Sequence, residues 1–326
     1  MILLLCGGGG SEHEVSLKSA DYIESKLKLT SHKYIRLTLL KNFQMIDNEK
    51  HSYVFQHSSN LVSEFTNVSN KITYIIPCIH GTPGEDGKIQ AYFDLLKIPY
   101  MGPGQEASLM SFNKITTKMW AKSIGINTAP FEVITNTNSI NFEKAEVFFN
   151  QHKDIYVKAT HQGSSIGVYH VTDFSELKEK IIKAIELSPY VLLEKTIKGR
   201  ELEVIVFEYK KELISTGPAE ILLTGENFYT FEEKYGQTSH ATVEINAPGI
   251  PDETKLKLQA HSKAIFKALK LKDLSRIDFF LEGETIYLNE INTFPGHTNI
   301  SVFPRLLEST GIKYVDYLND LINEDK

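Results

Sequence analysis

The stretch "RIDFFLEGETIYLNEINT", from Arg276 to Thr293, decides how the fold of this chain is interpreted. Two strand-like apolar runs lie on either side of a glycine, which predicts a β-hairpin. If the hairpin is centred on Glu284, then Asp278 lies directly opposite Glu290, and opposed side chains of antiparallel strands point to the same face. Asn292 shares that face because side chains alternate along a strand. The hairpin therefore gathers two carboxylates and an amide in one place.

Two carboxylates on one buried face repel each other unless a cation lies between them. Oxygen ligands without Cys or His suit Mg²⁺ or Mn²⁺, and Mg²⁺ is commonly held by one or two carboxylates together with substrate phosphates. We therefore predict a metal site at Asp278, Glu290 and Asn292. The alternative is that these side chains mark the solvent-facing end of an edge strand.

The composition narrows the class of protein. The chain has 326 residues, of which 41% are hydrophobic and 23% charged, so we expect a globular protein with two or three domains. A net charge of -6 argues against a general nucleic-acid binder. No apolar stretch approaches the length of a membrane span, and "MILLLC" is too short for a signal-peptide core. Cys6 and Cys78 lie in apolar runs and are predicted to be buried thiols. We expect a cytoplasmic protein with no nucleic-acid or membrane partner.

Strands and helices alternate at the start of the chain. The order is the strand "ILLLC", a glycine loop with a helix, the strands "KYIRLTLL" and "ITYIIPCIHG", and the short helix "GKIQAYFDLLKI". This order predicts a doubly wound, mostly parallel sheet for residues 1 to about 100. A small α+β unit follows, and the last third holds antiparallel strands, a helix near 252–270, the opening hairpin and a helical tail. The predicted fold class is α/β followed by α+β.

Several residues in the middle of the chain suit phosphate binding. The glycine-serine loop "HQGSSIGV" contains Ser164, and backbone N–H groups in such a loop can approach phosphate oxygens closely. Lys114 and Lys158 lie on neighbouring elements, where their ammonium groups can hold an α- or β-phosphate. Glu194 and Glu201 follow a buried strand and can hold an adenine edge and ribose hydroxyls, although plain salt bridges are an equal alternative.

Two loops near the N-terminus leave their roles open. His80 lies in "CIHGTPGEDGKIQ" and is either a core histidine or a substrate contact. Glu14 is either the capping-box partner of Ser11 or the group that holds a substrate ammonium. The glycines of "GGGGSEHE" do not form a dinucleotide fingerprint, because its last glycine is missing and the acidic residues there would repel a pyrophosphate.

Six motifs occur in the order found in one known family: "EHEVSLKSA", "HGTPGEDGKIQA", "VKATHQGSSIGV", "EKTIKGRELEV", "FYTFEEKY" and "RIDFF…LNEINTFPGHTNIS". Together they resemble the D-alanine–D-alanine ligases of the ATP-grasp superfamily, over essentially the whole chain. The resemblance implies three domains: an N-terminal substrate-binding domain (1–100), a central ATP-grasp subdomain (101–197) and a C-terminal catalytic domain (198–326) that sandwich ATP.

The resemblance also implies the reaction. ATP would phosphorylate the carboxylate of one D-alanine, and the amine of a second D-alanine would attack the acyl phosphate, giving D-alanyl-D-alanine, ADP and phosphate for peptidoglycan precursor synthesis. Two Mg²⁺ ions, replaceable by Mn²⁺, would be held by the predicted metal site. A homodimer is the usual assembly in such a family.

The resemblance assigns roles to the candidate residues. Catalysis would depend on Glu14, Ser164, Tyr235, Arg276 and the Gly296 backbone N–H. Lys114, Lys158, Ser164, Glu194 and Glu201 would bind ATP. Glu14, His80, Glu85, Lys234 and Ser301 would bind the two substrates, and the loop Tyr229–Tyr235 would close over the site as a lid.

This chain departs from the family pattern at Asn113, Ala159, Gln162 and His297, where Asp, Pro, an acid and Met are usual. None of these changes removes a predicted metal ligand or phosphate lysine. An alternative function is an ATP-grasp ligase that uses D-lactate or D-serine as its second substrate. Retention of Tyr235 favours the dipeptide. A catalytically silent ATP-binding protein is disfavoured because Arg276 and the metal ligands are all present.

Overall fold

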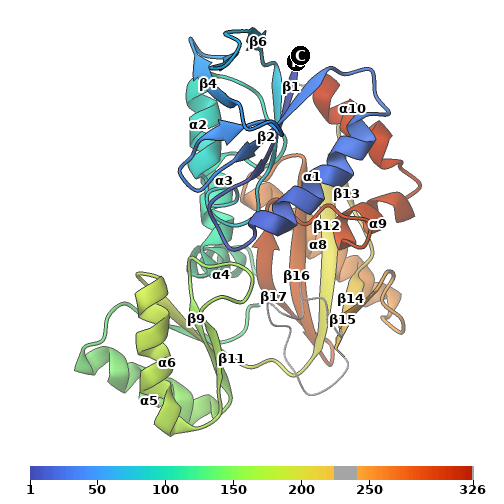
Figure 1. Ribbon diagram of the computed structural model, residues 1–326. Coiled ribbons are helices and arrows are strands. Elements are labelled where there is room, and N and C mark those ends of the chain that lie inside the picture. The colour runs from blue at the N-terminus through green and yellow to red at the C-terminus, as the bar shows by residue number, and fades with distance from the viewer. Residues whose placement is uncertain (224–240, 325–326) are drawn as a thin grey trace.

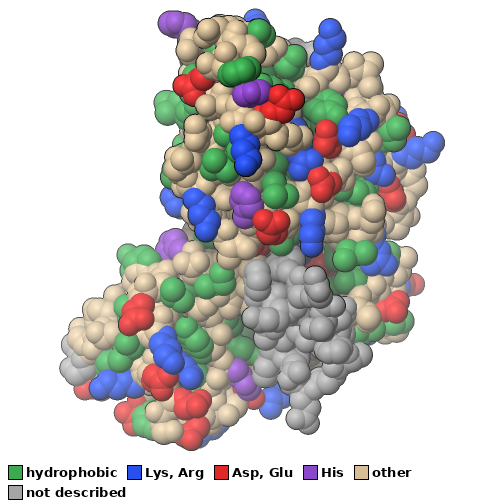
Figure 2. Space-filling model, in the orientation of Figure 1, with side chains coloured by type: hydrophobic (Ala, Val, Ile, Leu, Met, Phe, Trp, Pro, Cys, Tyr) green, Lys and Arg blue, Asp and Glu red, His purple; other side chains and the backbone are tan. Residues whose placement is uncertain are grey.

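The computed structural model describes residues 1–223 and 241–324, which form three β-sheets flanked by helices (Figure 1). Each sheet comes from one contiguous part of the chain, and the middle sheet with its helices forms a separate lobe. Charged side chains of both signs are interspersed over the face shown in Figure 2. In the described part of the chain, no helix combines the length and apolar character needed to span a membrane.

The N-terminal sheet has seven strands in the order β6-β5-β4-β3-β2-β1-β7. They are β1 (Ile2–Gly7), β2 (Tyr34–Leu39), β3 (Met45–Ile46), β4 (Ser52–Gln56), β5 (Asn60–Ser63), β6 (Ser69–Lys71) and β7 (Tyr74–Cys78). Strand β1 pairs in parallel with β2 and β7, as the sequence predicts. Strands β3 to β6 extend the sheet as an antiparallel meander that the sequence analysis did not anticipate.

Both faces of β1 are buried, which is typical of a parallel sheet. Leu4 and Cys6 pack towards α1 (His13–Leu27), while Leu3 and Leu5 pack towards α2 (Lys88–Leu96). Both cysteines are buried and free, as predicted. Helices α3 (Gln105–Phe112) and α4 (Lys114–Ser123) then lead out of this unit towards the middle sheet.

The middle sheet is antiparallel in the order β10-β9-β11-β8. Its strands are β8 (Phe131–Ile134), β9 (Ile155–Ala159), β10 (Val168–Val171) and β11 (Val191–Lys195). Helices α5 (Ser139–His152) and α6 (Phe174–Leu187) bury one face, where Ile155 and Val157 of β9 contribute to the core. The alternate residues Tyr156 and Lys158 are only partly buried, so they face away from these helices.

The C-terminal sheet contains the hairpin with the predicted metal ligands. Its strands are β12 (Arg200–Tyr209), β13 (Glu212–Ser215), β14 (Ala219–Leu223), β15 (Ala241–Glu244), β16 (Leu274–Glu282) and β17 (Thr285–Asn292). Helix α8 (Asp252–Ala268) packs on one face, and α9 (Val302–Ser309) and α10 (Tyr314–Glu324) pack on the other. The last two helices share a core with β1 and α1, so the end of the chain joins the first unit to the third.

The hairpin pairs the predicted metal ligands as expected, but its turn is centred at a different position from the one predicted. Asp278 pairs with Glu290, and Arg276 pairs with Asn292. The turn is centred one half-residue earlier than Glu284, however, since Glu282 pairs with Thr285. A β-bulge between Asp278 and Phe279 absorbs the difference. It places Leu288 in the core while Glu290 lies on the opposite face.

The expected fold class is thus confirmed: a unit with a parallel centre followed by two antiparallel units with helices. The exact domain boundaries at residues 100 and 197 stay a prediction.

Candidate active site

Arg276 and Asp278 form the centre of the site on β16. Arg276 donates from Nε and Nη2 to the two oxygens of Asp278, each at 2.8 Å, and its Nε lies 3.3 Å from Glu203 on β12. All three side chains are largely buried. Burial opposes the charged guanidinium, but Asp278 and Glu203 outweigh it and hold the pKa of Arg276 well above its ordinary value. Arg276 is therefore a fixed cation within a carboxylate-rich pocket.

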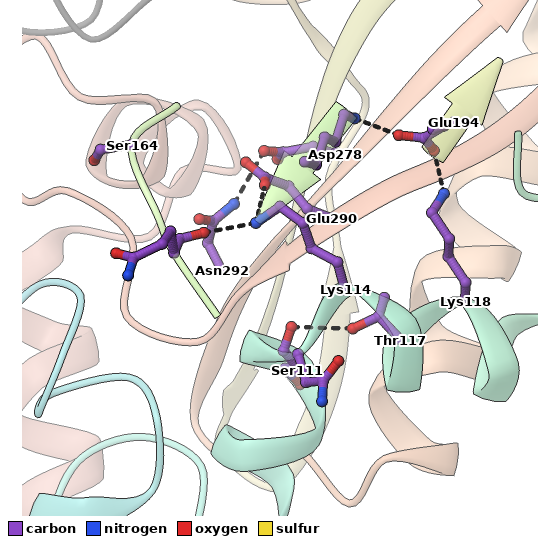
Figure 3. Close-up of polar contacts among 12 residues, drawn as sticks. Ser111, Lys114, Thr117, Lys118, Ser164, Glu194, Asp278, Glu290 and Asn292 are labelled. Atoms are coloured by element: carbon purple, nitrogen blue, oxygen red, sulfur yellow. Dashed lines mark hydrogen bonds and ion pairs between the residues drawn. The ribbon is translucent and has the colours of Figure 1, made fainter. Parts of the chain in front are cut away.

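The predicted metal ligands come together as expected from the register. The Asn292 amide donates to Asp278 at 3.0 Å, and Glu290 lies beside them (Figure 3). Glu290 is the more accessible carboxylate, with 27% of its side chain exposed, against 2% for Asp278. In the described part of the chain, no cluster of three His, Cys, Asp or Glu side chains is placed to hold a metal. The candidate set is instead two carboxylates plus one amide, all hard oxygen donors that suit Mg²⁺ or Mn²⁺.

Lys114 links this hairpin to the glycine-serine loop. Its Nζ lies 3.9 Å from a carboxylate oxygen of Glu290 and donates to the backbone carbonyl of Gln162 at 2.8 Å (Figure 3). Asn113 caps the helix that carries Lys114, because its side-chain oxygen accepts from the N–H groups of Ile115 and Thr116. Asn and Asp are both favoured N-cap residues, so the amide at position 113 provides the cap that an Asp there would provide.

Glu194 contacts Lys158, as well as Lys118, a lysine that the sequence-based prediction missed. The two oxygens of Glu194 on β11 contact Lys118 of α4 and Lys158 of β9, one each. Burial alone would raise the pKa of Glu194, but the two ammonium groups together lower it to about 2. The Glu194 side chain thus serves as the partner of two lysines. This matches the salt-bridge alternative for that residue.

The glycine-serine loop has a backbone shaped for close approach. Ser164 and Ser165 both have positive φ angles, of 51° and 60°, which non-glycine residues rarely adopt. The loop is tied down at its start, where Gln162 donates to the carbonyl of Leu187 at 2.9 Å and the Asn113 amide lies 3.3 Å from His161 Nε2. Such strain, held by surrounding contacts, is characteristic of ligand-binding loops.

The structure places Glu12, and not Glu14, beside Ser164. Ser164 Oγ donates to Glu12 at 2.5 Å, whereas Glu14 is exposed in the first turn of α1. The predicted capping box is also absent, because the N-cap of α1 is Glu12 and it makes no side-chain capping bond. A helix starting at His13 directs residue 14 outwards and leaves residue 12 in the loop. The motif "EHE" contains both acids, and only the position at which the helix begins determines which of them faces Ser164.

Glu12 lies between two glycine-containing loops. Its Oε2 would be 2.7 Å from a Cβ at Gly81 and 3.5 Å from one at Gly163, so both glycines allow its close approach. Gly81 also donates to Glu85 Oε2 at 2.9 Å. Burial, with the neighbouring charge of Glu12, raises the pKa of Glu85 to about 8. This pocket is therefore acidic and suits a group that brings positive charge, such as a substrate ammonium.

His80 and Glu85 hold the loop after β17. Phe294 donates its N–H to Glu85 at 3.2 Å, and its carbonyl lies 3.1 Å from His80 Nδ1. The other ring nitrogen of His80 lies 2.9 Å from Ser19 Oγ, and burial lowers the pKa of the ring. Since His80 Nδ1 can only donate to a carbonyl, the ring is a neutral Nδ1–H tautomer that accepts from Ser19. His80 thus belongs to the core and also positions the loop after β17.

Gly296 and Ser301 lie together at the end of that loop. A Cβ at Gly296 would be 3.1 Å from Ser301 Oγ, and Thr298 donates its N–H to the same hydroxyl at 3.0 Å. His297 points the other way: it is fully buried among aromatic rings, and burial lowers its pKa to about 3. The departure at position 297 therefore lies in the core.

The remaining predicted site residues are the lid loop, with Lys234 and Tyr235, and Glu201 of β12. Lys234, Tyr235 and the lid loop Tyr229–Tyr235 fall outside the described residues. Glu201 lies half-buried on β12, on the same strand face as Glu203. Its charge, after burial and Asp154, helps to raise the pKa of Tyr156 on β9, so it lies where the middle and C-terminal units meet.

The assembled site has three parts: a carboxylate–amide set with a buried arginine, lysines beside a strained glycine-serine loop, and an acidic pocket. The first two suit the phosphates of a nucleotide with a divalent cation. The third suits an amino group. Sequence reasoning missed Glu12 and Lys118; the spacing of Lys118 four residues after Lys114, on one helix face, was the available signal for the latter.

Comparisons with known proteins agree with this geometry. Residues 1–103 match the model of the D-ala D-ala ligase N-terminus, and residues 120–323 match that of its C-terminus. A D-alanine--D-alanine ligase of Vibrio vulnificus is 43% identical over 324 residues, covering 98% of each chain. The solved structure of a D-alanyl-alanine synthetase A from Vibrio cholerae superposes with a TM-score of 0.93 at 41% identity, covering 99% of this chain and 97% of that one.

A more distant solved structure shows how widely this fold is shared. The VanG D-Ala:D-Ser ligase of Enterococcus faecalis superposes with a TM-score of 0.87 at 25% identity, covering 100% of this chain and 99% of that one. The family models together span most of the chain, and the curated relative matches from end to end. The chain belongs to the D-alanine–D-alanine ligase family.

Proposed function

We propose that this protein joins two D-alanine molecules into D-alanyl-D-alanine at the expense of ATP. The observation that carries the proposal is the position of Lys114, whose ammonium contacts both the glycine-serine loop and Glu290 of the hairpin. A phosphate placed there would meet cationic and backbone donors on one side and the candidate cation site on the other. The family membership supports the same reaction.

The proposed chemistry has two steps. A carboxylate is a poor electrophile, so the γ-phosphoryl group of ATP is first transferred to a carboxylate oxygen of one D-alanine, which releases ADP. The amine nitrogen of the second D-alanine then attacks the carbonyl carbon, and the C–O bond to phosphate breaks. Arg276 and the Gly296 N–H are proposed to stabilise the negative charge on the tetrahedral intermediate.

The N-terminal pocket is proposed to orient the first substrate. Glu12, held by Ser164, would bind its ammonium, and His80 and Glu85 would fix the loop that presents Gly296. Glu12 takes the role that the sequence analysis gave to Glu14. Ser301, together with Lys234, is proposed to bind the carboxylate of the second substrate.

Mg²⁺, or Mn²⁺ in its place, is proposed to be held by Asp278, Glu290 and Asn292. When bound, it would neutralise charge on the transferring phosphoryl group. The residues fit because all three supply oxygen donors and because Glu290 is accessible.

The test is phosphate release from Mg-ATP with D-alanine, L-alanine or no amino acid, with product analysis. The expected result is release only with D-alanine and formation of the dipeptide. Adding D-lactate or D-serine in competition tests the second substrate, and we expect D-alanine to be preferred. Release that is independent of D-alanine would refute the proposal.

Family resemblance also supports a homodimer and a cytoplasmic location. We propose both; light scattering of the purified protein and fractionation of cells would test them.

A further inference from the structure

The cluster formed by Lys118, Glu194 and Lys158 is unusual because it buries two lysines around one carboxylate. The exposed fractions of these side chains are 1%, 3% and 12%. They come from α4, β11 and β9, so three elements converge on the cluster. A buried lysine is costly unless it is paired, so the presence of a second lysine needs a physical reason.

The charges in the cluster do not cancel. Each oxygen of Glu194 contacts one ammonium group, and two cations on one carboxylate leave one positive charge in excess. Lys118 is sealed from solvent, whereas Lys158 lies on the side of the middle sheet that its helices leave uncovered. The excess charge is therefore accessible at Lys158. An ammonium has three N–H donors, so contact with Glu194 leaves Lys158 able to donate elsewhere.

We infer that Lys118 is a positioning residue for ATP binding, because it shares the charge of Glu194 and thereby leaves the Glu194–Lys158 pair with a net positive charge that Lys158 presents to a phosphate oxygen. The inference rests on the proposed function only in assigning an ATP phosphate to Lys158. Without Lys118, Glu194 and Lys158 would form a neutral pair, and a phosphate would compete with the whole carboxylate charge for the same ammonium.

The charge state of Glu194 supports the idea that it competes with a phosphate for Lys158. Its pKa is lowered to about 2 by the two lysines, so the carboxylate is ionised throughout the working range of a protein. For Lys118, burial lowers the pKa and Glu194 opposes that effect. Each buried charge thus depends on the other, while Lys158 is the member left to act on a ligand.

The test is the affinity of the full-length protein for Mg-ATP, measured by calorimetry without D-alanine. Lys118→Met and Lys118→Gln both remove the charge, and Gln keeps a donor to Glu194 should the Met variant fail to fold. We expect the Kd to rise roughly tenfold or more, the effect of losing one charge-assisted hydrogen bond. Lys118→Arg should remain close to wild type.

Two further variants separate this role from a merely structural one. Lys122 lies one turn along α4, is exposed, and contacts the Phe131 ring at 4.2 Å, so Lys122→Met is a matched control expected to leave the Kd unchanged. Adding Glu194→Gln to Lys118→Gln removes the competing carboxylate and should restore much of the affinity. A folded Lys118→Gln variant with wild-type affinity, or a double variant no better than the single one, would overturn the inference.

The outcome stays distinct from that of the proposed function. A wild-type protein that binds Mg-ATP but releases no phosphate with D-alanine would refute the ligase activity, and the comparison of Kd values would still decide the role of Lys118.

Discussion

Replacing Arg276 with methionine removes the cation on which two buried carboxylates depend. Arg276 contacts both oxygens of Asp278 at 2.8 Å and lies 3.3 Å from Glu203. The side chains of Asp278 and Glu203 are each only 2% exposed. Methionine fills much of the same volume, so the change acts mainly on charge and hydrogen bonding.

The expected cost follows from this burial. Removing one partner of a buried ion pair typically destabilises a protein by about 3–5 kcal/mol, because the other charge stays buried and unpaired. Loss of a group that stabilises charge in the transition state is expected to lower kcat by roughly 10²–10³-fold as well. Mg²⁺ should return part of the lost stability, because a cation between Asp278 and Glu290 replaces some of the missing charge, and EDTA should remove that gain.

The assay is urea unfolding and D-alanine-dependent phosphate release, with Arg200→Met as control. Arg200 also makes a bidentate ion pair, donating to the two oxygens of Glu220 at 2.7 and 2.6 Å. The Arg200 side chain, however, is 33% exposed. Arg200→Met also leaves a largely buried carboxylate, since the Glu220 side chain is 7% exposed. The Arg200 side of the pair is open to water, however, so we expect a smaller loss of stability than for Arg276→Met, with activity retained. Equal losses of stability in the two variants, or an active Arg276→Met enzyme, would refute the reasoning.

Three other predictions follow from particular contacts. Glu12→Gln should abolish most D-alanine-dependent phosphate release while Glu14→Gln leaves it within about twofold of wild type; the reverse pattern would restore the sequence-based assignment. Because the folded-state pKa of Glu194 is lowered from 4.5 to about 2, its stabilisation of roughly 3 kcal/mol is present above pH 4.5 and lost as the pH falls towards 2. Urea unfolding at a series of pH values should therefore show a steeper acid loss in wild type than in Glu194→Gln, and equal slopes would contradict this. Gly84→Ala should raise the KM for D-alanine and lower the Tm, since a Cβ there would overlap a backbone carbonyl, whereas Gly217→Ala, with nothing within 4 Å, should do neither in a thermal-shift and kinetic comparison.

The hairpin shows how far a local pattern can be trusted. Alternation along two strands was enough to predict that Asp278 faces Glu290, and the structure confirms this pairing. The assumed hairpin geometry was wrong in detail, because the turn is shorter than expected and a β-bulge restores the pairing of Asp278 with Glu290. The apolar positions 286, 288 and 291 already break strict alternation in the sequence, and that irregularity was the signal for the bulge.

The acidic pocket shows the opposite case. Glu12 and Glu14 are separated by a single residue and have the same chemistry, so no pattern of residue types distinguishes them. Two features of the tertiary structure determine that Glu12 contacts Ser164. Helix α1 begins at His13, and the loop with Ser164, 152 positions away in the sequence, packs beside Glu12. Lys118 was overlooked for a similar reason: a lysine on an amphipathic helix is usually solvated, and its burial depends on Glu194 arriving from a distant strand.

The sequence by itself determined the order of strands and helices, the hairpin that gathers the candidate metal ligands, and the family, because periodicity and motif order are local properties of the chain. Only the tertiary structure decided which acid meets Ser164, which lysines surround Glu194, and that His297 lies in the core. Those choices depend on where a helix begins and on which distant elements pack together, and such long-range contacts leave no mark on the spacing of neighbouring residues.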